Sequence, residues 1–307
     1  MKANINQFGI AVIIVMSGIL LPSVLLSTTV NAQNNTKEQL TVALSQPGKS
    51  FTLAVNIKKG AVRVTQGEGK EIEVDIEQEQ KKSGKGQPNQ NINTNTNVNI
   101  NINIHQPKEQ RLPANGGKYL SIQENNNTVN IKQTWTQAPL NVVVRLPRGA
   151  TPQRITINGS SDISVVNIKS EMEINTSGGA VSLAGISGSV IANTVNGNIT
   201  AHFKSADSGA PMAFSTLGGN IDISFPSTLK ASVKLKSDNG SIHTDFHIEQ
   251  DKQHPEARPN PERNKNPGNL PGYKLNNSGW VYGKINEGGA EIMMRNVSGN
   301  ISIRKTK

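Results

Sequence analysis

The chain has 307 residues, of which 34% are hydrophobic and 4% are aromatic, and its formal net charge is +10. The absence of cysteine excludes disulfides, thiolate metal sites, a cysteine nucleophile and the lipidated cysteine of a bacterial lipoprotein. So few aromatic residues are unusual for a compact globular core, where large rings supply much of the buried area. The basic residues are scattered rather than clustered, so the charge alone does not predict a nucleic-acid partner.

Residues 1–32 have the composition of an export signal. Lys2 supplies a positive charge, residues 8–26 are almost wholly apolar, and Val30 and Ala32 are small residues suited to a cleavage site after Ala32. The alternative is an uncleaved anchor, because the apolar run is nearly long enough to span a bilayer. No second run of this kind follows, so we expect no transmembrane helix in the mature chain.

Residues 33–150 are expected to form an N-terminal β region, either a meander or a sandwich-like arrangement. Residues 119–133 predict a hairpin whose turn lies in an asparagine run, and residues 139–147 predict a more continuously apolar strand. Three further segments alternate apolar and polar residues, which predicts half-buried strands. These segments are 50–57, 60–66 and 70–79.

Two insertions interrupt the β pattern. Residues 81–117 are rich in asparagine, with apolar residues at every second position from Val98 to Ile104. This pattern is compatible with a flexible loop or with a protruding arm that pairs edge to edge with another strand. Residues 249–272 contain many prolines and charges without apolar periodicity, which indicates an irregular excursion.

Residues 151–307 carry a repeat in which a glycine turn precedes a short alternating strand. Three copies are nearly the same nine residues: "VNGNITAHF" at 195–203, "LGGNIDISF" at 217–225 and "DNGSIHTDF" at 238–246. A period of about twenty residues is typical of stacked repeats, because one unit cannot bury its apolar face alone. We therefore predict a β-solenoid-like stack similar to a right-handed parallel β-helix. The alternative is a set of ordinary hairpins in a β-sandwich.

Side chains two positions apart in a strand share a face, so the repeat separates an inward set from an outward set. The predicted inward residues are Val181, Leu183, Ile199, Ala201, Phe203, Ile221, Ile223, Phe225, Ile242, Thr244, Phe246, Ile301 and Ile303. Glycine is expected at the corners because the turn requires a backbone conformation that a Cβ disfavours. The structural turn glycines are Gly179, Gly188, Gly197, Gly219, Gly240 and Gly299.

These motifs resemble a bacterial putative-adhesin β-strand-repeat family, a domain of unknown function. The resemblance covers most of the mature chain apart from the two insertions. It implies an exported, solenoid-like domain of the cell envelope and brings no catalytic residues. The segments that carry it are Pro147–Gly149, "INGSSDISV" (157–165), "INTSGGAVSL" (174–183), "IANTVNGNITAHF" (191–203), "NVSGNISIRK" (296–305) and "VNIKKGAVRVTQGEGKEIEV" (55–74).

One outward patch is a candidate metal site. If the repeats stack in chain order, the outward positions form ladders with strands about 4.8 Å apart, which is within reach of metal bridging. The patch would consist of His202, Asp222, His243, Asp245 and His247. The simpler interpretation is that outward positions of a solenoid are polar in any case, and no helical zinc motif is present. We therefore assign no metal and no cofactor.

The alternative function is a polysaccharide-acting β-helix enzyme. Its outward carboxylates would be Asp222 and Asp245, together with Lys204 or Lys234, but no second acidic row accompanies them. The favoured prediction is a non-enzymatic adhesin or a structural binding module, located in the periplasm, at the cell surface or outside the cell. The candidate partners are a glycan, an envelope component, another protein, or a second copy paired through strand edges.

Overall fold

The computed structural model describes residues 37–78, 100–102, 120–134, 139–206, 209–251, 273–275 and 279–306. Every helix or strand element in these ranges is a β-strand, as the sequence predicts. The predicted leader and most of both predicted insertions lie outside the described residues. Within the described ranges, no helix has the length and apolar character needed to cross a membrane.

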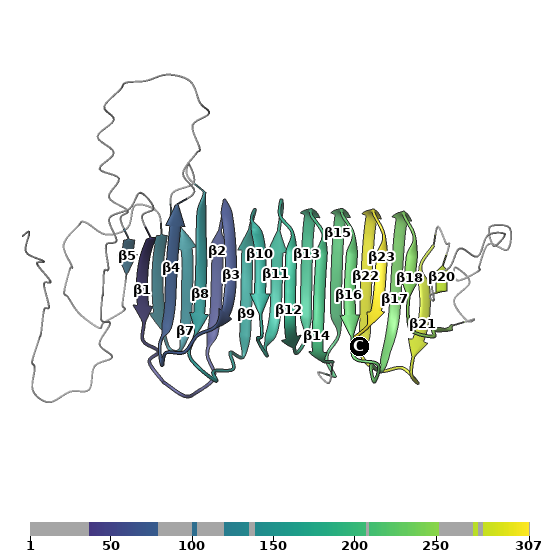
Figure 1. The fold of residues 1–307 in the computed structure, drawn as a ribbon, viewed down its shortest axis with the longest axis horizontal. Helices are drawn as coiled ribbons and strands as arrows, with labels where there is room; N and C mark the ends of the chain where they lie inside the picture. The colour runs from purple at the N-terminus through teal and green to yellow at the C-terminus, as the bar shows by residue number, and fades with distance from the viewer. Residues whose placement is uncertain are drawn as a thin grey trace, which may run out of the picture.

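The strands form two long sheets that run the length of an elongated molecule (Figure 1). Sheet A has the spatial order β1 (Lys37–Val42), β4 (Ile72–Gln78), β8 (Leu140–Leu146), β3 (Gly60–Gln66), β10 (Asp162–Val166), β12 (Val181–Ser187), β14 (Ile199–Ser205), β16 (Ile221–Phe225), β23 (Ile301–Lys305), β18 (Ile242–Thr244) and β20 (Tyr273–Leu275). Sheet B has the spatial order β19 (Glu249–Gln250), β21 (Val281–Ile285), β17 (Ala231–Asn239), β22 (Glu291–Ser298), β15 (Met212–Gly218), β13 (Val190–Asn196), β11 (Glu171–Thr176), β9 (Arg154–Gly159), β2 (Thr52–Ile57), β7 (Thr128–Gln133), β6 (Leu120–Asn125) and β5 (Ile100–Ile102).

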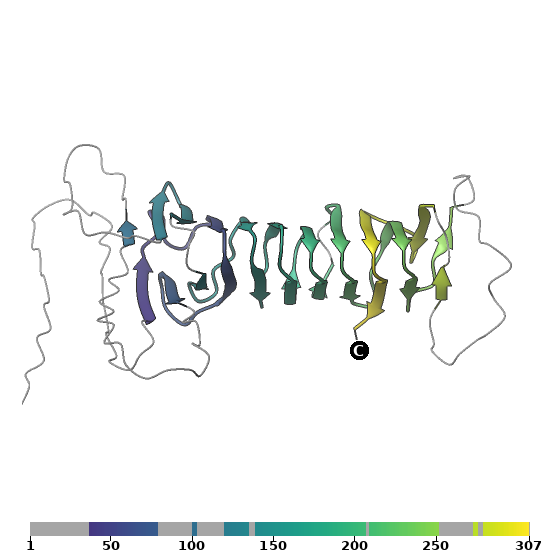
Figure 2. The same cartoon turned by 90° about the horizontal axis from the view of Figure 1, so that it is seen from above.

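The repeat region is a stack of coils, and each coil gives one strand to each sheet (Figure 2). Neighbouring coils pair in parallel, so that Ile199 lies beside Ile221 and Ile221 lies beside Ile301. All the predicted inward residues are at most 2% exposed. The solenoid-like prediction is therefore confirmed over the hairpin alternative, because hairpins would pair antiparallel.

The coils do not stack in chain order at the C-terminal end. β22 and β23 are the last strands of the chain, yet they lie between the coil of β15 and β16 and the coil of β17 and β18. In Figure 1 these two yellow strands stand among green ones. The expectation that consecutive repeats are neighbours in space is therefore wrong at this end.

The intercalated coil also interrupts the column of phenylalanines. Phe203 and Phe225 stack with ring centroids 4.7 Å apart, as the repeat predicts. The next position in the sheet belongs to Lys305, which pairs with Phe225. The Lys305 ammonium lies 5.1 Å from the ring centroid of Phe246. The third nine-residue copy is thus separated from the first two by a coil with a different residue at this position.

The N-terminal strands belong to the same two sheets. β2 and β3 lie in opposite sheets, β2 parallel to β7 and β9, and β3 parallel to β8 and β10. Of the two arrangements expected for these strands, the meander is wrong, and the two facing sheets correspond to the sandwich-like alternative. The predicted hairpin is confirmed as β6 and β7, and its turn residues Asn126 and Asn127 have positive φ. From the asparagine-rich insertion, residues 100–102 form β5 beside β6.

Candidate interaction surface

The coil corners require glycine because the backbones of neighbouring coils approach closely there. An added Cβ at Gly197 would overlap the carbonyl of Gly179, and one at Gly219 would overlap the carbonyl of Gly197. The same obstruction exists at Gly179 and Gly240. Positive φ is present among the six predicted turn glycines only at Gly188 (104°) and Gly299 (128°). The expected reason for glycine, a backbone conformation that a Cβ disfavours, therefore applies to Gly188 and Gly299. At the other four corners glycine is required because the backbones of neighbouring coils approach closely.

A buried polar ladder holds these corners together. Each member lies three residues before a corner glycine and donates a hydrogen bond to a carbonyl of the adjacent coil. The bonds are Thr176 Oγ1 to Ser161 O (2.9 Å), Thr194 Oγ1 to Gly179 O (2.9 Å), Thr216 Oγ1 to Gly197 O (2.9 Å), Asn296 Nδ2 to Gly219 O (3.2 Å) and Ser237 Oγ to Gly299 O (3.0 Å). The sequence analysis missed this role, although the T-x-x-G spacing could have indicated it.

A second ladder follows the glycines on the outside of the stack. The amide N–H of Asn220 donates to Asn198 Oδ1 at 2.8 Å, and that of Asn300 donates to Asn220 Oδ1 at 2.8 Å. The amide N–H of Ser241 donates to Asn300 Oδ1 at 2.9 Å. Together the two ladders fix the spacing of the coils, so that the side chains on the outer faces stand in regular rows.

The outer face of sheet B carries an exposed apolar patch. Leu217 is 57% exposed, and Ile191 and Val195 are each 42% exposed. They are the exposed large hydrophobic residues of the described chain, and all three lie on the neighbouring strands β13 and β15. We call the following residues the β15 patch: Ile191, Val195, Ala213, Leu217, Met293 and Val297. A cluster of exposed apolar residues of this kind is typical of an interaction site.

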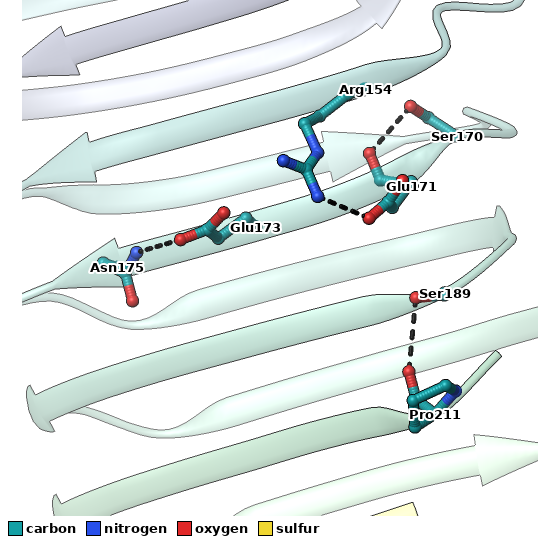
Figure 3. Close-up of polar contacts among 7 residues, drawn as sticks. All are labelled: Arg154, Ser170, Glu171, Glu173, Asn175, Ser189 and Pro211. Atoms are coloured by element: carbon teal, nitrogen blue, oxygen red, sulfur yellow. Dashed lines mark hydrogen bonds and ion pairs between the residues drawn. The ribbon is translucent and has the colours of Figure 1, made fainter. Parts of the chain in front are cut away.

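An acidic and polar flank lies on one side of the β15 patch, and Figure 3 shows its side chains on β9 and β11. Glu171 of β11 pairs with Arg154 of β9 at 2.6 Å, and both side chains are half exposed. The hydrogen bond to Glu171 raises the pKa of Arg154 above its ordinary value. Glu173, the next outward residue of β11, accepts a 3.4 Å hydrogen bond from the neutral amide of Asn175. Glu173 forms no ion pair with another described residue, but its charge also helps to raise the pKa of Arg154.

A cationic and aromatic flank lies on the other side. The Lys234 ammonium stands 4.7 Å from the Trp280 ring centroid and 5.7 Å from that of Tyr282. Such contacts hold a cation in place over the negative face of a ring. Lys236 pairs with Asp238 at 3.2 Å, whereas Lys234 has no carboxylate partner within the described chain. This flank therefore carries a positioned positive charge without an acidic partner.

The predicted metal patch is divided by the intercalated coil on sheet A. Asp222 lies beside Ser302, and Ser302 lies beside His243, so the aspartate and the histidine are not on neighbouring strands. His202 lies beside Ser224 on the next row. His202, His243, Asp245 and His247 are all exposed. In the described part of the chain, no group of three or more His, Asp or Glu side chains is placed to hold a metal ion.

Of the candidate enzyme residues, the two aspartates both act on Arg304. Asp222 Oδ1 accepts a 2.7 Å hydrogen bond from Arg304 Nε, which raises the pKa of that arginine. Asp245 accepts a 3.2 Å hydrogen bond from the amide of Lys305. Lys204 donates to Asn167, and Lys234 lies on the opposite sheet from both aspartates. Lys234 is therefore not placed beside the two aspartates, and the basic residue that both of them act on is Arg304.

Comparison with known proteins identifies one family and two solved structures. The family model described as Toastrack DUF4097 matches residues 27–270. A putative cell adhesion protein from Clostridium sporogenes is 9% identical with a TM-score of 0.41, and the match covers 89% of this chain and 100% of that chain. A putative adhesin from Bacteroides fragilis is 8% identical with a TM-score of 0.30, covering 90% and 98% respectively. No curated protein gives a significant match.

Proposed function

The chain belongs to the Toastrack DUF4097 family, and we propose that it is an exported cell-envelope protein that works as a non-enzymatic adhesin or structural binding module. The observation that carries this proposal is the outer face of sheet B. There, exposed apolar residues lie between an acidic flank and a cationic flank on one rigid stack of strands. An extended face of this kind is the surface that repeat proteins use for binding.

Export is supported by the first 32 residues, which combine a positive start, an apolar run and a small-residue ending. The basic net charge of +10 is compatible with anionic envelope components outside the cytoplasm. The partner class at this stage is a glycan, an envelope component or a protein.

Proteinase treatment of intact cells tests the location. We expect the chain to be cleaved, beginning within the proline-rich 249–272 segment, because its sequence predicts an irregular excursion and such segments are preferred cleavage sites. Survival of the chain until the envelope is opened would contradict the adhesin function and leave an internal structural role. Recovery of a chain that still carries residues 1–32 would identify that segment as an anchor.

A substitution on the proposed surface tests the mechanism. Cells that express Leu217→Asp should lose most of their attachment or aggregation, because a carboxylate would break the apolar patch. Ser182→Asp provides the matched control, since Ser182 is exposed on the outer face of sheet A. Equal attachment by the wild-type chain and both variants would overturn the proposed role of sheet B.

A further inference from the structure

The outward residues of sheet B have a symmetrical arrangement about β15. On one side the order of strands is β13, β11 and β9, and on the other side it is β22, β17 and β21. The register places Glu173, Ile191, Ala213, Met293 and Lys234 in one continuous row across five strands. The row therefore has an acid at one end, a base at the other and apolar side chains between.

A two-fold axis parallel to β15 would bring this row onto a second copy of itself. Strand β11 of one copy would face β17 of the other, and β13 would face β22. Glu173 would then face Lys234, and Ile191 would face Met293. A two-fold interface requires such self-complementarity, because each contact occurs twice with the partners exchanged.

The next outward row is polar and consists of Asn193, Ser215 and Arg295, so that Arg295 would face Asn193 of the second copy. The outward row beyond it is again apolar and is compatible with the same operation. Val195, Leu217 and Val297 lie at equivalent positions of β13, β15 and β22, as the flanking register pairs define. Leu217 would face Leu217 of the second copy at the axis, and Val195 would face Val297. The most exposed apolar side chain, at 57%, would thus lie at the centre of the contact. Central apolar residues are the ones that carry most of the energy of an interface.

We propose that the outer face of sheet B is a self-complementary interface through which two copies of this chain pair face to face. This inference rests on the proposed function, because it names a second copy of the chain as the partner that binds the same surface. Two sheets packed in this way lie about 10 Å apart with their strands nearly aligned. Glu173 acts electrostatically on Arg154 without forming an ion pair with it, and Lys234 forms no ion pair within the described chain, so these two charges supply the complementarity between the copies.

The strand edges are less suited to self-association than this face. Among the described residues, three of the four strands at the ends of the two sheets are short: β5 has three residues, β19 has two and β20 has three, while β1 has six. Short edge strands offer few unpaired backbone groups, which is one way in which proteins avoid edge-to-edge pairing. The face is therefore the preferred surface for a second copy.

Sedimentation of the purified chain over a range of concentrations provides the first test. The wild-type chain should form dimers, and Leu217→Asp should weaken the dimer by about a hundredfold, since it places two carboxylates at a buried centre. Ser182→Asp, on sheet A, should leave the dimer unchanged. A wild-type chain that stays monomeric at every concentration would overturn the proposal.

A charge exchange provides the decisive test. Glu173→Lys alone and Lys234→Glu alone should each weaken self-association by about tenfold or more, because like charges would face each other. An equimolar mixture of the two variants should recover the dimer, since each new charge then meets its opposite. Circular dichroism of each variant establishes that the fold is retained. Failure of the mixture to associate would exclude the proposed pairing, even if each single variant is folded.

The two proposals can fail separately. A monomeric chain whose attachment to cells is still lost in Leu217→Asp would exclude the second copy and leave another occupant, such as a glycan or a different protein, on the same face. Conversely, the charge variants could disrupt the dimer while proteinase fails to cleave the chain on intact cells. That pair of results would support the interface and exclude the adhesin function.

Discussion

At the scale of single residues, the corner glycines are set by contacts between coils more than by their own backbone angles. Gly218 and Gly219 are adjacent and chemically identical, yet their surroundings differ. A Cβ at Gly219 would overlap the carbonyl of Gly197, whereas a Cβ at Gly218 would meet Asn196 Oδ1 at 3.3 Å. A side-chain oxygen can move by a few tenths of an ångström, but a carbonyl within a stacked coil cannot.

This pair gives a direct prediction. Gly219→Ala should lower the free energy of unfolding by about 1–3 kcal/mol, because the coils must separate to admit the methyl group. Gly218→Ala should change it by less than about 0.5 kcal/mol, as exposed substitutions usually do. Urea denaturation of both variants measures the difference. Equal effects would contradict close approach as the reason for glycine at position 219.

At the scale of one element, the ends of five strands of sheet B are held by a buried side chain that reaches the adjacent coil. Thr216 is 2% exposed and donates a 2.9 Å hydrogen bond to the carbonyl of Gly197. The alternation of the strand places this threonine inward among apolar residues. A buried carbonyl that loses its donor is costly, so the hydroxyl is required although the position belongs to the core.

We expect Thr216→Val to destabilise the protein by about 1–2 kcal/mol, because it keeps the shape of the side chain and removes the donor. Thr200→Val is the matched control, since Thr200 is exposed on β14 and should give no measurable loss. Thermal unfolding followed by circular dichroism compares the two. A Thr216→Val protein as stable as the wild type would show that the hydroxyl does not stabilise the corner.

At the scale of the whole molecule, the intercalated C-terminal coil makes the last residues of the chain internal to the stack. β22 pairs in parallel with β15 on one side and with β17 on the other, and β23 does the same with β16 and β18. In a stack of repeats each coil is stabilised mainly by its neighbours. The coil of β17 and β18 therefore depends on a segment that comes later in the chain.

Deletion of residues 288–307 should consequently disturb more than a terminal coil. We expect the amides of β17 and β18 to lose hydrogen-exchange protection, while those of β9 to β12 keep it, because the removed coil is the bridge between the two parts. Hydrogen exchange read by mass spectrometry reports each segment. Full protection of β17 in the truncated chain would mean that β15 and β17 can pair directly and that the coil is dispensable.

Much of this architecture follows from local pattern alone. The alternation around Ile199, Ile221 and Ile301 predicted which side chains are buried, because a strand with a two-residue period needs no distant information to separate its faces. The asparagine turn between β6 and β7 was likewise predictable from local turn chemistry. The acidic and cationic flanks of sheet B were not predicted, since β11 and β17 are distant in sequence and meet across β13, β15 and β22 only in the folded stack.

The sequence by itself determined the class of fold, the inward residues of each coil and the positions of the corner glycines, because these depend on spacing within one repeat. Only the tertiary structure decided the order of the coils. Each corner in the buried ladder has a glycine and a short polar side chain, and the inward rows consist mainly of aliphatic residues, so local spacing does not specify which coil stacks on which. The place of β22 and β23, and with it the outward rows of both sheets, is decided by long-range pairing across the whole stack.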